Sequence, residues 1–180
     1  MSTVAAMENE SGPLGKAERW RQSFDQGFSE PRTERRTGIA DYLAVQVGGR
    51  DFALCLTQIS ALHPWRGVVP CPCGCEALLG LADVANTVLP VYALSRLMGL
   101  DQAAAPGWLV VMQAAPCALA FDAFEQFLRL GPEARIRAAD RPDGARHAYE
   151  MLQVGDSHRP LIDLASVLGG IQALIQAQAS

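Results

Sequence analysis

The stretch that most constrains the fold of this chain is residues 77–100, ALLGLADVANTVLPVYALSRLMGL. Its first part is rich in leucine and valine, which favour a pleated, buried surface, and it predicts two short strands with a turn at 86–87. Pro90 has no backbone N–H to donate, so we expect the second strand to be an edge or an end there. Helical spacing over 93–98, followed by Gly99, predicts a short helix and its stop. No side chain here is reactive, which indicates a packed surface that a partner can bind.

Short strands separated by turns are expected through most of residues 39–180. The expected strands are 42–47, 50–56, 57–62 (entered through a helical turn), 108–113, 117–121, 124–130, 147–154 and 159–162. Residues 131–146 are polar and predict a long surface loop. A last helix is expected from Asp163, with a kink or break at Gly169 and Gly170 because glycine weakens helices. Many short strands with regular turn signals predict an all-β fold of small barrels rather than a parallel sheet.

Residues 1–38 differ in character from the rest and predict an extension ahead of a folded domain at 39–180. Apolar residues recur there at spacings of three and four, which predicts an amphipathic helix over 14–28 and then a linker. The bulky residues on its apolar face are Trp20, Phe24 and Phe28. Two interpretations stay open: the helix docks on its own domain, or it lies in a groove of a partner.

Charge and hydropathy exclude several classes of partner. The net charge is −4 and the pI is near 5.3, whereas nucleic acids and anionic membranes select basic surfaces. The sequence has no apolar run of the roughly 18 residues that a membrane-spanning helix needs, and its N-terminus lacks the pattern of a secretory signal. We therefore expect a cytoplasmic protein, with its five cysteines reduced.

Residues 70–100 resemble the central motif of the CheW-like proteins, the coupling adaptors of chemotaxis. The matching positions are Pro70 and Pro72 in a loop, Gly80 after a short apolar segment, Thr87 at a turn, the strand Leu89, Pro90 and Val91, and the closing Gly99 and Leu100. Residues 42–54, 108–130 and 159–168 resemble, in that order, the family's opening hairpin, the strands of its second half, and its closing strand and helix. The resemblance implies two packed SH3-like barrels of five strands each, with short helices and a C-terminal helix.

The resemblance also implies a function without catalysis. An adaptor of this family binds the regulatory domain of a CheA-like histidine kinase through one barrel. It takes the cytoplasmic hairpin tip of a methyl-accepting chemoreceptor in the crevice between the barrels. We therefore expect a scaffold in chemotaxis-type signal transduction, located at membrane-associated receptor arrays without entering the membrane, and needing no cofactor.

Three positions depart from the family pattern. The family's Arg-Gly pair before the threonine is Ala85 and Asn86 here, and an acidic residue usual in an earlier strand is Ala61. Asparagine tolerates the left-handed turn conformation, but alanine cannot supply the forked donors of arginine. The residues expected at the partner interface, with the first three supplying replacement contacts, are His63, Trp65, Arg66, Asp83, Ala85, Asn86 and Thr87. An alternative is an adaptor that has lost one partner and acts as a competitor or hub.

The cysteine-rich segment supports a second alternative. Cys71, Cys73 and Cys75 lie within five residues and could hold zinc if Cys55, Cys117 or His63 completed a tetrahedron, which would make this a metal-binding or redox module. No second Cys-x-x-Cys pair accompanies them, and small residues are usual in this loop of the family. The sequence contains no P-loop, Gly-x-Ser-x-Gly elbow or His-Glu-x-x-His motif, so we do not expect an enzyme.

Overall fold

The computed structural model describes residues 38–72, 74–137 and 145–178. The helix predicted at 14–28, with Trp20, Phe24 and Phe28, lies outside the described residues. The strands are β1 (Ala40–Val47), β2 (Arg50–Cys55), β3 (Ile59–Pro64), β4 (Leu78–Val84), β5 (Thr87–Ala93), β6 (Trp108–Met112), β7 (Ala118–Phe121), β8 (Ala123–Leu130), β9 (Arg135–Arg137), β10 (Ala148–Val154) and β11 (Ser157–Ile162). The helices are η1 (Leu56–Gln58), α2 (Leu94–Leu97), η2 (Pro132–Ala134) and α3 (Leu164–Gln178).

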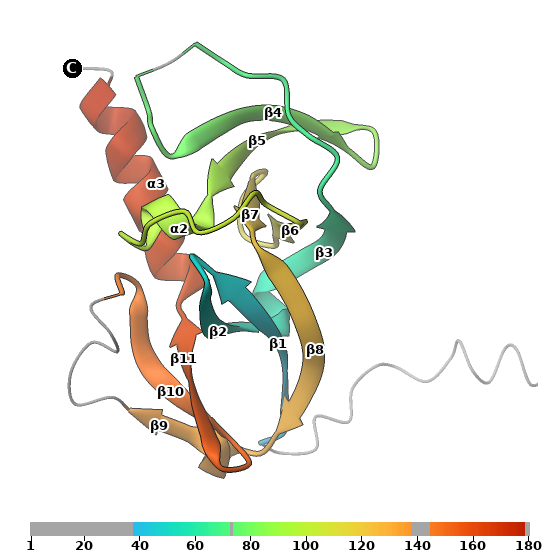
Figure 1. Ribbon diagram of the computed structural model, residues 1–180, viewed down its shortest axis with the longest axis vertical. Coiled ribbons are helices and arrows are strands. Elements are labelled where there is room, and N and C mark those ends of the chain that lie inside the picture. Colours follow the sequence, from blue (N-terminus) through green and yellow to red (C-terminus); the bar gives the residue numbers. More distant parts are fainter. Residues whose placement is uncertain (1–37, 73, 138–144, 179–180) are drawn as a thin grey trace, which may run out of the picture. The chain divides into compact units, whose positions relative to one another are not determined.

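The strands form two sheets, shown in Figure 1. Sheet A has six strands in the order β8-β1-β2-β11-β10-β9, and sheet B has five in the order β3-β6-β7-β5-β4. The predicted mostly-β fold with two sheets, short helices and a C-terminal helix is confirmed. Sheet A has one strand more than expected because the three-residue β9 pairs with β10.

Strand β1 is buried on both of its faces, which explains its nearly continuous apolar sequence. Tyr42 and Ala44 contribute to the core of sheet A, together with Leu152 and Leu161. The alternate residues of β1 belong to a second core that includes residues of both sheets and of α2 and α3. A third core lies within sheet B. The alternation of successive side chains thus places β1 between two cores.

The turn between β4 and β5 lies one residue earlier than predicted. Ala85 and Asn86 are the turn residues, with φ of 52° and 64°, and Val84 pairs with Thr87. Two residues with positive φ characterise a type I′ turn, whose twist suits a two-residue hairpin loop. The prediction of a turn at Asn86 and Thr87 is therefore wrong, because Thr87 already belongs to β5.

The expectations for Pro90 and Gly99 are confirmed. Strand β5 is interior to sheet B, but its pairing with β7 begins only at Val91, so Pro90 has β4 as its one neighbour. At the end of α2, Gly99 adopts a φ of 71° and donates its N–H to the carbonyl of Arg96, while Leu100 donates to Ser95. These two bonds form a Schellman motif, which satisfies the last carbonyls of the helix.

Two expectations for the C-terminal third are wrong. Residues 131–146 are not one loop, because η2 and β9 form within them. Helix α3 runs without a break through Gly169 and Gly170. The Asp163 Oδ1 atom accepts the N–H groups of Ala165 and Ser166, which caps the N-terminus of α3.

Candidate partner-binding surfaces

An exposed apolar surface lies on the outer side of β4 and β5. The register pairs Leu81 with Pro90 and Asp83 with Val88, so these four side chains share one face, while Ala82, Val84 and Leu89 turn into the core of sheet B. Val88 is 66% exposed and Leu81 39% exposed. We call Val69, Leu81, Asp83, Val88 and Pro90 the β4–β5 face. It offers apolar area beside a single carboxylate.

Val69 joins this face through a bridge to β4. Its N–H donates to the carbonyl of Leu81 at 2.8 Å, and the Leu81 N–H donates back at 2.9 Å. The bridge depends on Gly80, whose φ is +148° and whose missing Cβ would lie 2.2 Å from the Val69 carbonyl oxygen. This close approach holds the segment after β3 against β4, and leaves the Val69 side chain 72% exposed.

Three predicted interface residues lie at or just after the end of β3. His63 pairs with Leu109 of β6 and is half-buried. Trp65 donates its backbone N–H to Gly107, and its half-buried ring packs against the core of sheet B. Arg66 is exposed. Of these three, Arg66 therefore offers the freest side chain to a partner, whereas Trp65 has a structural role as well.

The other four predicted residues lie at the β4–β5 turn. Asp83, Ala85, Asn86 and Thr87 are all exposed, and Asp83 belongs to the β4–β5 face. Strands β3 and β4 occupy opposite ends of the order of sheet B, and the Val69–Leu81 bridge brings the chain from one toward the other. In Figure 1 the end of β3 and the β4–β5 turn project to the same side.

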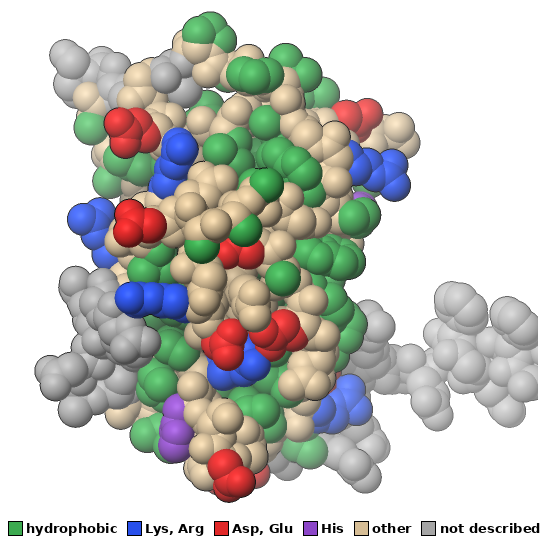
Figure 2. All heavy atoms as spheres, viewed as in Figure 1, with side chains coloured by type: hydrophobic (Ala, Val, Ile, Leu, Met, Phe, Trp, Pro, Cys, Tyr) green, Lys and Arg blue, Asp and Glu red, His purple; other side chains and the backbone are tan. Residues whose placement is uncertain are grey.

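A second apolar surface, which was not expected from the sequence, follows β8. Rings of Trp108 and Phe124 meet edge to face at 5.6 Å between centroids, and those of Phe124 and Phe127 at 5.0 Å. We call these three residues the aromatic row. Trp108 and Phe124 pack against the core shared by both sheets, whereas Phe127 is 63% exposed. Figure 2 shows hydrophobic side chains gathered on the side where β8 runs.

A bulge in β8 creates the aromatic row. The pairing with β1 shifts between Ala44 and Val45, so Phe124 and Phe127 lie opposite Val45 and Leu43 and point to the same side of the sheet. In a regular strand, residues three apart would point to opposite faces. The sequence signal was the aromatic spacing in AFEQFLRL, but the bulge that aligns the two rings cannot be read from it.

A shallow crevice of about 380 Å³ adjoins the row, with Leu56, Leu128 and Phe127 on its apolar side. Asp41 and Arg129 complete its lining and bind each other, with Nε to Oδ1 at 2.7 Å and Nη2 to Oδ2 at 3.2 Å. The hydrogen bond from Arg129 is the main cause that holds the pKa of Asp41 below its usual value, and slight desolvation opposes it. The crevice is thus apolar with a neutral ion pair at its rim.

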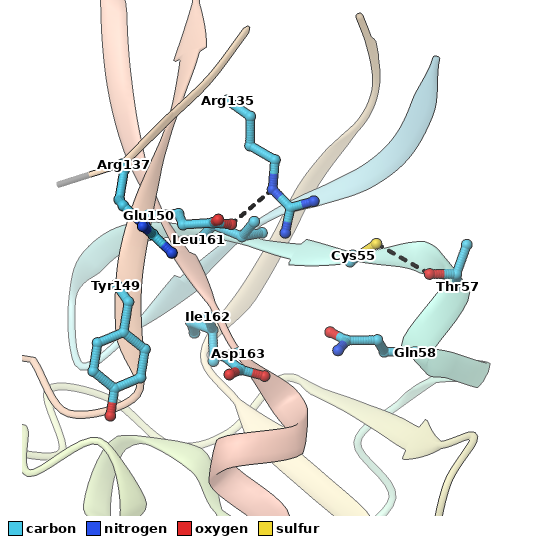
Figure 3. Close-up of a pocket in the computed structure, with 10 residues that line it drawn as sticks. All are labelled: Cys55, Thr57, Gln58, Arg135, Arg137, Tyr149, Glu150, Leu161, Ile162 and Asp163. Atoms are coloured by element: carbon cyan, nitrogen blue, oxygen red, sulfur yellow. Dashed lines mark hydrogen bonds and ion pairs between the residues drawn. The ribbon is translucent and has the colours of Figure 1, made fainter. Parts of the chain in front are cut away.

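The charged residues that line the polar pocket in Figure 3 make contacts within the domain. About 430 Å³ in volume, it lies beside the start of α3. The Arg135 Nε atom binds Glu150 Oε2 at 2.7 Å, and Asp163 caps α3. The Cys55 sulfur lies 3.2 Å from the Thr57 hydroxyl. Its carboxylates therefore serve structure, and none of the described residues that line it is a histidine.

The cysteines proposed as zinc ligands do not converge in the part of the chain that is described. Cys117 is buried and its sulfur lies 3.5 Å from that of Met112, while Cys55 contacts Thr57. Burial raises the pKa of the Cys117 thiol. Cys73 lies outside the described residues, and among the others no group of three or more His, Cys, Asp or Glu side chains is placed to hold a metal ion.

Comparison with known proteins identifies the domain. The family model for the CheW-like domain matches residues 41–172. The chain belongs to the CheW-like family. The crystal structure of the scaffolding protein TtCheW from Thermoanaerobacter tengcongensis has the same fold, with a TM-score of 0.61 at 10% identity, over 69% of this chain and 88% of that one. No match was found among curated proteins.

Membership of the CheW-like family confirms the resemblance drawn from residues 70–100, and the TtCheW comparison confirms two SH3-like barrels, to which sheets A and B correspond. Both apolar surfaces lie within the matched residues. Among the described residues, no helix is long and apolar enough to cross a membrane.

Proposed function

We propose that this chain is a non-catalytic adaptor that couples chemoreceptors to a CheA-like histidine kinase at cytoplasmic receptor arrays. The observation that carries the proposal is that one CheW-like domain has two separate exposed apolar surfaces, the β4–β5 face and the aromatic row. Exposed apolar side chains grouped in this way mark protein interaction sites. An adaptor needs two such sites, because it must hold two partners at once.

The β4–β5 face is assigned to the kinase regulatory domain. Val69 and Val88 are its most exposed side chains, at 72% and 66%, and Asp83 of β4 is the one charged residue in these two strands. Ala85 stands where the family has arginine, so the turn supplies no cation. Burial of apolar area would then dominate binding, and the affinity would depend weakly on salt.

The aromatic row is assigned to the chemoreceptor tip. Phe127 and the adjoining crevice present apolar side chains to a helical hairpin, which can place leucine or isoleucine side chains between them. Aromatic anchors in a central position commonly dominate interface energies. Coupling then requires only that the adaptor binds better to one state of the receptor–kinase assembly than to the other.

The test is a double dissociation between two exposed-site variants. Val88→Glu puts a charge on the β4–β5 face and should weaken binding to the kinase regulatory domain by about tenfold or more, with receptor binding kept. Phe127→Glu should weaken binding to the receptor tip by a similar factor and leave binding to the kinase regulatory domain unchanged. Ile136→Glu, at a 42% exposed position on β9, is the matched control and should change neither. If both partners respond equally to both variants, the assignment of two separate surfaces is wrong.

The predicted replacement contacts are tested separately. His63→Ala and Arg66→Ala remove side chains that are half-buried and exposed, so loss of kinase binding in either would support a contact there. Trp65→Ala is a poor probe on its own, because it also removes packing against the core of sheet B. Unchanged binding in both single variants, and in the triple variant that adds Trp65→Ala, would end the idea that these three residues replace the family arginine.

A second candidate function is an adaptor that has lost one partner and works as a hub through residues 1–38. The observation that favours it is the absence of both family charges, at Ala85 and Ala61. Deleting the extension should then abolish partner binding, as should the combined substitution of Trp20, Phe24 and Phe28 by serine. Binding that survives deletion places the function in the domain.

A further inference from the structure

The side chain of Glu125 in β8 is bound from two other strands. Glu125 is the extra residue of the bulge, because it has no partner in β1 whereas the residues on either side of it do. Its Oε1 atom accepts a hydrogen bond from Nε2 of Gln46 in β1 at 2.9 Å, and its Oε2 atom lies 2.7 Å from Nη2 of Arg159 in β11. The residue that makes the bulge is thus also the residue that the rest of the sheet holds.

The ion pair of Glu125 and Arg159 crosses the sheet. In the order of sheet A, β8 and β11 are separated by β1 and β2, so the pair joins two strands that are not paired with each other. Only 14% of the Arg159 side chain and 26% of the Glu125 side chain are exposed. The Arg159 Nη1 atom is buried and has no hydrogen-bond partner among the described residues. A buried ion pair with an unpaired donor adds little stability, whereas in some proteins it specifies one arrangement of the chain.

Without the bulge, β8 could pair with β1 in either of two regular registers. In the first register, the pairs on the C-terminal side of the bulge are kept, and Glu125 lies opposite Val45 on the face of the core shared by both sheets. Its carboxylate would then leave Gln46 and Arg159 and meet apolar side chains, while Phe124 would turn to the opposite face. The contacts of Glu125 therefore oppose this register.

In the second register, the pairs on the N-terminal side of the bulge are kept. Glu125 stays on its present face, but every later residue of β8 changes sides. Leu128, which is 9% exposed, would leave the core of sheet A, and Gln126 would turn toward the core shared by both sheets. Burial of Leu128 therefore opposes this register, and only the bulge satisfies Glu125 and Leu128 together.

We propose that Glu125, held by Arg159 and Gln46, is the positioning residue of the aromatic row. Each regular register would turn one phenylalanine away, Phe124 in the first and Phe127 in the second. The bound carboxylate therefore keeps both rings on one side of the sheet, where their centroids are 5.0 Å apart, and presents Phe127 to the receptor tip. That last step rests on the function proposed for the aromatic row, whereas the alignment of the rings does not.

NMR of the full chain, without any partner, tests the alignment. Glu125→Ala removes both contacts, but Asp51 Oδ2 remains 3.5 Å from Arg159 Nη2 as a counter-charge, so the fold is preserved. We expect the nuclear Overhauser contacts between the rings of Phe124 and Phe127 to disappear, and the cross-strand contacts of β1 and β8 to change to the first register. Glu125→Gln keeps the length of the side chain and an acceptor oxygen, so it should keep the ring contacts.

Binding to a soluble receptor-tip fragment and to the kinase regulatory domain extends the test to function. Glu125→Ala should weaken binding to the tip fragment by about tenfold and leave kinase binding unchanged, whereas Glu125→Gln should bind both as the wild type does. Glu150→Ala is the matched control, because it removes the carboxylate of another ion pair of sheet A, with Arg135 at 2.7 Å and away from β8. It should change neither the ring contacts nor the binding.

The outcomes separate this proposal from the function assigned to the aromatic row. Positioning by Glu125 is overturned if the ring contacts survive in Glu125→Ala, or if Glu150→Ala disrupts them equally. It is also overturned if receptor binding withstands Glu125→Ala but not Phe127→Glu. Receptor binding that is unchanged in Phe127→Glu would instead refute the function proposed for the row, and the ring contacts would still decide whether Glu125 positions it.

Discussion

The imidazole ring of His147 lies against Gly170 of α3. A Cβ at Gly170 would come within 3.3 Å of the ring atoms Cε1 and Nε2, which is closer than side chains ordinarily pack. The Nδ1 atom of the same ring is 2.7 Å from the Ser166 hydroxyl, one helical turn earlier. A single ring thus contacts two successive turns of α3 from the residue before β10, and glycine is the residue that leaves room for it.

The two helix glycines should therefore respond differently to alanine. A Cβ at Gly169 would have no neighbour within 4 Å, so Gly169→Ala should stabilise the domain by about 0.5–1 kcal/mol through helix propensity. Gly170→Ala gains the same propensity but must displace the His147 ring, so its net effect should be smaller or destabilising. Urea unfolding of both variants measures the difference.

A double-mutant cycle checks the cause. Removing the ring with His147→Ala should make Gly170→Ala as favourable as Gly169→Ala, whereas the effect of Gly169→Ala should be the same in both backgrounds. Equal effects of the two glycine substitutions in the wild-type background would show that the contact between His147 and Gly170 does not limit this position.

These glycines also illustrate what the sequence could predict. Spacing of apolar residues was enough to expect most of the strands and a last helix that begins near Asp163, because those features depend on local periodicity. Nothing in the sequence distinguishes Gly169 from Gly170, and only the His147 ring packed against Gly170 makes the two positions differ in the space available to a side chain. The aromatic row was missed for a related reason, since a bulge opposite Ala44 and Val45 aligns rings that a regular strand would separate.

The turn residue Ala85 should be a site of backbone strain. Its φ is 52°, a conformation in which the methyl group crowds the backbone, at a cost of about 1 kcal/mol or more relative to glycine. Ala85→Gly should therefore stabilise the domain by about 1 kcal/mol without changing the β4–β5 face. Asn86→Gly should gain less, because asparagine tolerates this conformation well. Thermal unfolding of both variants tests the order, and a larger gain at Asn86 would contradict it.

Gly80 should be among the least replaceable residues of sheet B. A Cβ there would lie 2.2 Å from the Val69 carbonyl oxygen, which accepts the Leu81 N–H, so Gly80→Ala must break the bridge. We expect a loss of about 3 kcal/mol. Gly155→Ala is the matched control, because Gly155 also has a positive φ, of 61°, but a Cβ there has no neighbour within 4 Å. Its cost should be about 1 kcal/mol, from the backbone conformation alone. Similar losses in denaturant unfolding would show that the bridge adds nothing.

The ion pair of Asp41 and Arg129 should make stability depend on pH in the acid range. The hydrogen bond from Arg129 lowers the pKa of Asp41 in the folded state. The ion pair therefore stabilises the fold fully above the pKa of Asp41 in the unfolded chain, about 3.9, and this stabilisation is lost as the pH falls through the lower pKa of Asp41 in the folded state. Arg129→Gln should return the pKa of Asp41 toward its usual value, as measured by NMR titration of the carboxyl carbon. The stability difference between variant and wild type should be small, since both groups are exposed, and should vanish at a pH where Asp41 is protonated in both.

Arg137→Gln is the control, because Arg137 lies on β9, at the opposite end of sheet A from β8, and it should leave the titration of Asp41 unchanged. A pKa of Asp41 that does not move in Arg129→Gln would mean that the pair is not formed in solution.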